Sequence, residues 1–121
     1  MKKHLLIVDD DMYLIDLYAS RFVSLGCDVE RAHSGKEALE KIKKRIPDLV
    51  LMDISMPDMD GLETLEHIRA DEHIRAVRVV ILTNKGEPED ITKSTTLGAI
   101  GYIIKANVTP AELVSEVTHF L

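Results

Sequence analysis

The chain alternates short apolar runs, rich in β-branched residues, with stretches of helical period, and this order limits the fold more than any other feature. Apolar strands joined by helices are typical of βα units around a parallel sheet. Most runs are apolar throughout rather than at alternate positions, which indicates that helices cover both faces of the sheet. We therefore expect an α/β fold of three layers with five strands, at His4 to Val8, Cys27 to Ala32, Leu49 to Asp53, Val77 to Thr83 and Ile100 to Lys105.

Capping residues mark the predicted helix starts, because a side-chain oxygen and a Glu three residues later satisfy free backbone N–H groups. The pairs are Ser34 with Glu37, Asp60 with Glu63, and Thr109 with Glu112. The first helix should run from Met12 to Leu25 before Gly26, with an apolar stripe of Leu14, Leu17, Tyr18, Phe22 and Leu25. The segment from Glu87 to Leu97 has little apolar surface, so it is either a loosely docked helix or a face for a partner.

Length and charge exclude several classes of protein. The 121 residues fit one domain, 1–121, and the net charge of −6 argues against general affinity for nucleic acid or anionic membranes. No apolar run approaches the roughly 20 residues that span a bilayer, and the N-terminus lacks a signal-peptide pattern, so we expect a cytoplasmic protein. The single cysteine, Cys27, excludes an internal disulfide.

Polar residues interrupt the apolar pattern where predicted strands end. The first strand is followed by Asp9, Asp10 and Asp11, the third ends at Asp53, the fourth at Thr83 and the fifth at Lys105. In a parallel sheet these ends share one edge, where ligands bind. Crowded carboxylates repel one another unless a cation lies among them, and a few oxygen ligands suit Mg²⁺. The hydroxyl of Thr83 and the charge of Lys105 then suit a phosphoryl group in transfer.

Each of these residues also has a purely structural interpretation. Asp11 is expected to cap the first helix, and Asp9 or Asp10 alone could do the same. Thr83 alone is an ordinary strand residue, and Lys105 alone could extend its ammonium group to water. Asp53 is harder to explain structurally, since a carboxylate directly after four apolar residues is costly without a partner.

Four stretches of the chain together resemble the response-regulator receiver domains of two-component signalling. They are Leu5-Leu6-Ile7-Val8-Asp9-Asp10-Asp11, Pro47 to Gly61 around Asp53, Val80-Ile81-Leu82-Thr83, and Gly98 to Lys105. The resemblance covers the whole chain. It implies a doubly wound, flavodoxin-like parallel sheet of order 2-1-3-4-5. It also implies a phosphorelay switch rather than an enzyme acting on a separate substrate.

The resemblance further implies roles for individual residues around one Mg²⁺ ion. Asp53 would accept the phosphoryl group, Asp10 would ligate the metal directly, and Asp9 would hold a metal-bound water. Ser55 would contribute its backbone carbonyl to the ion. The remaining roles fall to Thr83 as the switch hydroxyl, Lys105 as ion-pair partner of the phosphoryl group, and Tyr102 as the aromatic side chain that changes rotamer.

The chain departs from the family pattern at two positions. Ala106 follows Lys105 where the family usually has proline, often after a cis bond, so either the site tolerates that geometry or the loop takes another path. Asn84 follows Thr83 where a small residue is usual, which could narrow access to the phosphoryl site.

The expected partners are a histidine kinase or phosphotransfer protein upstream and a further protein downstream. The downstream partner would contact the fourth helix, fifth strand and fifth helix. Thr109 to Leu121 contains no Lys or Arg, so the salt bridges by which many receivers dimerise cannot form, and we expect a monomer. The five histidines, His4, His33, His67, His73 and His119, are interpreted as solvated surface residues.

Two other classes of function remain open at this point. A phosphatase with an aspartate nucleophile also needs Asp at a strand end and Mg²⁺. Such enzymes have a second acid two positions later, where this chain has Ser55, and usually a large cap insertion. A receiver used as a constitutive binding module would lack one of the acids or the lysine, and all are present.

Overall fold

The computed structural model describes residues 2–84 and 86–121 and contains a five-stranded sheet of order β2-β1-β3-β4-β5. All neighbouring strands are parallel. The strands are β1 (His4–Val8), β2 (Asp28–Ala32), β3 (Leu49–Met52), β4 (Val79–Thr83) and β5 (Gly101–Ile104). The helices are α1 (Met12–Ser24), α2 (Gly35–Lys44), α3 (Gly61–Ala70), α4 (Pro88–Thr96) and α5 (Pro110–Thr118), with a 3₁₀ turn, η1 (Lys105–Asn107). The predicted fold is confirmed.

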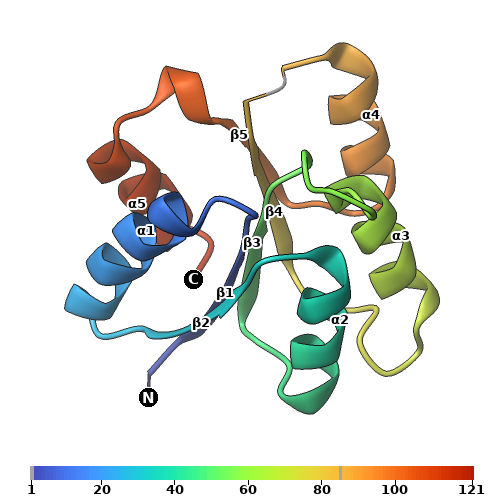
Figure 1. The fold of residues 1–121 in the computed structure, drawn as a ribbon, viewed down its shortest axis with the longest axis horizontal. Coiled ribbons are helices and arrows are strands. Elements are labelled where there is room, and N and C mark those ends of the chain that lie inside the picture. Colours follow the sequence, from blue (N-terminus) through green and yellow to red (C-terminus); the bar gives the residue numbers. More distant parts are fainter. Residues whose placement is uncertain (1, 85) are drawn as a thin grey trace.

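Helices cover both faces of the sheet, α1 and α5 on one side and α2, α3 and α4 on the other (Figure 1). Alternate residues of β1 enter different cores, because successive side chains of a strand point to opposite faces. Leu5 and Ile7 pack with α1 and α5, whereas Leu6 and Val8 pack with α2 and α3. All four are at most 1% exposed, which accounts for the continuous apolar run in the sequence.

Strand boundaries differ from the sequence prediction by one or two residues. β4 begins at Val79 rather than Val77, because the Val77 N–H donates to Ile74 O in a turn before the strand. β2 begins one residue after Cys27, and β5 lies within Ile100 to Lys105 without its end residues. Asp53 and Lys105 therefore follow their strands instead of ending them.

The helix starts follow the predicted capping chemistry, although only the last start has the full reciprocal pair. Thr109 and Glu112 accept from each other's backbone N–H groups. Ser34 and Asp60 each accept from the N–H three residues later, but Glu37 turns back to His33 instead of Ser34. The Glu87 to Leu97 segment does contain a helix, α4.

The predicted apolar stripe of α1 is confirmed at Tyr18 and Phe22, whereas Leu14 and Leu17 are only partly buried. The helix buries Ile15, Tyr18, Ala19 and Phe22, whereas Leu25 follows the helix and is 59% exposed. Gly26 takes a φ of +88°, the left-handed conformation that favours glycine after a helix. Leu25 is carried outward where the chain reverses at this glycine.

Candidate functional site

The strand register brings four chemically useful residues to the carboxyl edge of the sheet. Val8 is paired with Met52 across β1 and β3, so Asp9 and Asp53, the next residues, emerge side by side. On the other side of β3, Met52 pairs with Ile81 of β4. Thr83 pairs with Ile104 across β4 and β5, which places Lys105 beside the same edge. The parallel sheet thus converts four separate sequence positions into one cluster.

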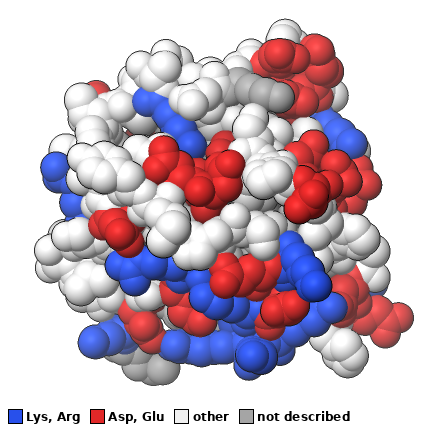
Figure 2. Space-filling view, in the orientation of Figure 1, with Lys and Arg blue, Asp and Glu red and all other residues white. Residues whose placement is uncertain are grey.

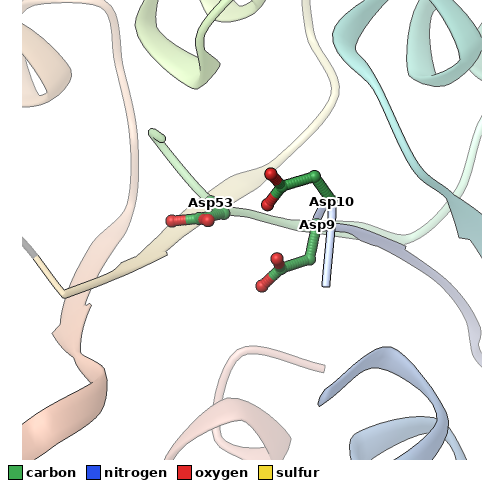
Figure 3. Close-up of side chains that lie close together, drawn as sticks. All are labelled: Asp9, Asp10 and Asp53. Atoms are coloured by element: carbon green, nitrogen blue, oxygen red, sulfur yellow. The ribbon is translucent and has the colours of Figure 1, made fainter. Parts of the chain in front are cut away.

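Three carboxylates form the centre of this cluster. Asp9, Asp10 and Asp53 each offer an oxygen, and these oxygens lie within 4.8 Å of one another (Figure 3). Asp9 and Asp53 are 3% and 6% exposed, whereas Asp10 is open to solvent. Figure 2 shows acidic side chains gathered near the centre of this view of the molecule. Like charges at such separations repel strongly in a partly buried site.

Lys105 supplies the opposing charge. Its Nζ lies 2.7 Å from Asp9 Oδ2 and 3.5 Å from Asp53 Oδ2. Burial alone would lower the pKa of Lys105, but the hydrogen bond to Asp9 and the charge of Asp53 outweigh burial and raise that pKa. The ammonium group therefore stays charged between the two carboxylates.

The surroundings of Asp53 change the pKa of its carboxyl. Burial raises the pKa of the Asp53 carboxyl, and the charge of Asp9 adds to the rise. The charge of Lys105 and a hydrogen bond with the Thr83 side chain oppose the rise without cancelling it. Thr83 itself is completely buried. Asp53 is thus held in a confined position with its ionised form destabilised.

Asp11 caps α1 and also makes a hydrogen bond to Asp9. Its carboxylate accepts from the N–H groups of Tyr13 and Leu14 at 3.0 and 3.2 Å, which confirms the predicted N-cap of α1. The Asp11 N–H also donates to Asp9 Oδ1 at 2.9 Å. Both oxygens of Asp9 therefore have a partner, Asp11 on one side and Lys105 on the other.

The loop after Asp53 folds back closely on the carboxylate's own backbone. The Gly61 N–H donates to Ile54 O at 2.8 Å, and a Cβ at Gly61 would lie 2.1 Å from Asp53 O. Asp58 takes a φ of 69°, a left-handed conformation that aspartate tolerates better than most residues. Sequence reasoning assigned Gly61 no part in the site. Its signals were the Asp-Gly pair that opens α3 and its place at the end of the stretch from Pro47 that resembles receiver domains.

The other predicted site residues lie around the cluster. Ser55, two residues after Asp53, is exposed, and Tyr102 on β5 is half-buried and packs against the core between the sheet and α2, α3 and α4. Asn84 is exposed directly after β4. The Lys105–Ala106 peptide bond is trans and opens the turn η1, so the loop takes the second of the two paths considered for it.

The donor set fits a hard divalent cation. Three carboxylates supply oxygens only, one of them open to water, and this is the environment in which Mg²⁺ keeps part of its hydration shell. The repulsion among the carboxylates is the feature that a cation would relieve.

His4 contradicts the interpretation that all five histidines are solvated surface residues. It begins β1, an inner strand of the sheet, and is 4% exposed, with Nε2 2.6 Å from Glu30 Oε1. The Glu30 carboxylate, on the neighbouring strand β2, offers this buried imidazole a polar partner. His33 is half-buried, and His67, His73 and His119 are exposed as expected.

A comparison with protein families decides the identity. The family model of the response regulator receiver domain matches residues 5–118. The chain belongs to this family. It is a phosphorelay switch of two-component signalling, as its resemblance implied.

Curated relatives of this receiver include proteins of different length. Sporulation initiation phosphotransferase F of Bacillus subtilis is 39% identical over 106 residues, covering 87% of the receiver and 83% of that protein. The transcriptional regulatory protein ZraR of Escherichia coli O157:H7 is 37% identical over 101 residues. That match covers 84% of the receiver but only 22% of ZraR, so the receiver spans about a fifth of this longer relative.

Solved structures agree with this assignment. Chemotaxis response regulator CheY4 of Vibrio cholerae superposes with a TM-score of 0.90 and 27% identity, covering 100% of both chains. A CheY-like receiver domain protein from Methanospirillum hungatei gives 0.89 and 32% identity, over 98% of this receiver and 93% of that chain. No helix in residues 2–84 and 86–121 has the length and apolar character needed to cross a membrane.

Proposed function

We propose that Asp53 is the phosphoacceptor of this receiver. The observation that carries the proposal is the position of its buried carboxylate, 3.5 Å from Lys105 Nζ and hydrogen-bonded to the Thr83 side chain. In the proposed transfer, the N–P bond of a phosphohistidine on a partner breaks and a P–O bond to an Asp53 oxygen forms. The product is an acyl phosphate, and the histidine leaves as imidazole.

Asp10 and Asp53 would ligate one Mg²⁺ ion, with Asp9 holding a bound water and Ser55 contributing its backbone carbonyl. Bound Mg²⁺ would neutralise part of the charge on the transferring group. Asp9 and Asp10 would fix the ion next to Asp53. Lys105 is already charged and within reach of an Asp53 oxygen, so it would pair with the phosphoryl group.

Thr83 and Tyr102 would carry the signal away from Asp53. A phosphoryl group adds strong acceptor oxygens, which would attract the Thr83 hydroxyl. Tyr102 would then change rotamer beside α4, and the face formed by α4, β5 and α5 would move between two packings. The receiver would assist its own phosphorylation and dephosphorylation, with no separate substrate. Its cytoplasmic location stays a prediction.

The decisive experiment is mass spectrometry of the protein after incubation with acetyl phosphate and Mg²⁺. We expect one phosphoryl adduct that disappears in base, is absent without Mg²⁺ and is absent in Asp53→Asn. Asp48→Asn is a matched control outside the site, and it should retain the adduct. An unchanged adduct in Asp53→Asn would contradict the assignment.

The proposed donor is a histidine kinase or phosphotransfer protein, and the proposed output is a different protein bound by a monomeric receiver. Residues 109–121 contain no Lys or Arg, so α5 cannot contribute the basic partners of an ion-paired dimer. Light scattering on the protein with Mg²⁺ and beryllofluoride, a mimic of the phosphoryl group, should give the monomer mass. A symmetric dimer that forms only on activation would show that this output is wrong.

A further inference from the structure

Arg69, near the end of α3, ties three segments of the chain together at the amino edge of the sheet. Its Nε donates to Leu97 O at 2.7 Å and its Nη2 to Gly98 O at 3.2 Å, just after α4. Its Nη1 donates to Arg75 O and Val77 O, both at 2.7 Å, in the loop before β4. A single guanidinium thus satisfies four backbone carbonyls of two loops with a geometry that lysine cannot reproduce.

The end of α4 is also fixed by its own backbone. The Ala99 N–H donates to Ser94 O at 2.9 Å, and the Ile100 N–H donates to Val79 O at 2.8 Å, joining the loop to the start of β4. Ser94 is 1% exposed. The last turn of α4 is therefore held to α3, to β4 and to the core.

Arg78 holds the end of α5 in a comparable way. Its Nη1 donates to Phe120 O, two residues after that helix. The Phe120 ring lies directly against the start of β5, since a Cβ at Gly101 would lie 2.8 Å from its Cζ. Both helices of the proposed output face thus have one end attached by an arginine at the amino edge.

The opposite ends of the same helices are attached differently, and at the start of the turn before α5 it is Lys105 that pairs with Asp9 and Asp53. Glu87, at the N-cap of α4, makes no side-chain capping bond among the described residues, unlike the caps of α1, α2, α3 and α5. The segment that leads into α5 is the short turn η1, whose closing bond from Val108 N to Lys105 O measures 3.4 Å. These ends lie at the carboxyl edge, next to Thr83 and Lys105.

We propose that Arg69 and Arg78 act as fixed pivots, so that activation moves the carboxyl-edge ends of α4 and α5 while their amino-edge ends stay in place. This inference rests on the proposed phosphorylation of Asp53 for its trigger, but not for the pivots themselves. A helix held at one end converts a small shift beside the phosphoryl group into a tilt. The partner would accordingly detect a change in helix angle rather than a sliding of the whole face.

Residue-resolved amide hydrogen exchange on the full chain tests both parts, using Mg²⁺ and beryllofluoride as the activating probe. In the wild type, activation should change exchange rates severalfold in residues 88–92 and 102–109 and by less than twofold in 97–100 and 119–121. Changes in 97–100 as large as those in 88–92 would overturn the pivot. No change anywhere, even in residues 53–55, would instead contradict the proposed function.

The Arg69→Met variant tests the pivot without activation. Arg75→Met is the matched control, because Arg75 has an exposed side chain and lies in the loop before β4 that Arg69 contacts. Exchange in residues 97–100 should rise roughly tenfold in Arg69→Met only, because local opening follows the bonds that are lost. Arg69→Lys should be intermediate, and it serves if Arg69→Met fails to fold. Exchange unchanged in a folded Arg69 variant would overturn the proposal.

Discussion

The carboxyl and amino edges of the sheet differ in how their charged side chains are paired. At the carboxyl edge, three carboxylates of like charge lie together, and one lysine pairs with two of them, Asp9 and Asp53. At the amino edge, charged side chains pair with an opposite charge or donate to backbone carbonyls. Arg45 pairs with Asp28 at 2.7 Å, and Arg69 donates to carbonyl oxygens. The carboxyl edge therefore keeps a repulsion that a cation would relieve, whereas these charges at the amino edge have their partners within the protein. This difference indicates where function lies in such a sheet. Repulsion among carboxylates lowers stability, so its persistence at one edge points to a ligand that relieves it there.

Removing Asp10, the exposed carboxylate at the carboxyl edge, should have the largest effect. Asp10→Ala should weaken Mg²⁺ or Mn²⁺ binding by about 100-fold, because even indirect changes at metal sites cost 10–100-fold. Isothermal titration of the folded variant measures this affinity. The control is Asp16→Ala, an exposed carboxylate on α1 that pairs with Arg31. Equal affinity in Asp10→Ala and wild type would remove Asp10 from the metal site.

A substitution at the amino edge should change the stability of the protein rather than its metal affinity. Arg69→Met should lower the free energy of unfolding by roughly 2 kcal/mol, because it leaves backbone carbonyls without donors. Urea denaturation of this variant and of Arg75→Met gives the comparison, and the latter should stay within about 0.5 kcal/mol of wild type. Equal losses in the two variants would mean that the carbonyl contacts do not stabilise this edge.

Asp53→Asn should stabilise the metal-free protein. We expect the free energy of unfolding to rise by on the order of 1 kcal/mol, the scale of an ordinary substitution. The folded-state pKa of Asp53 lies above its unfolded value, so the folded state binds more protons, and stability falls as pH rises through that window. The gain should therefore be small below about pH 4, the ordinary range of this carboxyl, and grow toward neutral pH. Urea denaturation across this range would contradict us if the gain shrank as pH rose.

The smallest effect is expected at an exposed pair between α3 and α4. Lys93 Nζ lies 2.8 Å from Glu66 Oε1, and both side chains are about half exposed. Lys93→Ala should leave the denaturation midpoint unchanged within error at physiological salt, since exposed ion pairs contribute little. A clear loss would mean that this pair, and not Arg69, anchors α4.

The sequence predicted the sheet and the carboxyl-edge cluster because both follow from periodicity and topology. Thr83 ends its strand, and Asp53 and Lys105 directly follow theirs, at strand ends that any parallel sheet must bring to one edge. Strand boundaries were less predictable, since a turn such as the one at Val77 depends on contacts made elsewhere in the chain.

Tertiary partners explain what the sequence did not reveal. Buried His4 depends on Glu30 of the neighbouring strand, which no local pattern announces. An arginine near the end of a helix, such as Arg69, ordinarily suggests a solvated surface residue. Its four carbonyl acceptors come from loops that only the folded chain assembles.

The contact between Lys105 and Asp9 joins residues 96 positions apart in a chain of 121. During synthesis, the first of these residues leaves the ribosome early and must wait for the other. A nascent or partly folded molecule therefore has its acids without their lysine. Competence for the proposed phosphoryl transfer would then appear only when folding is finished.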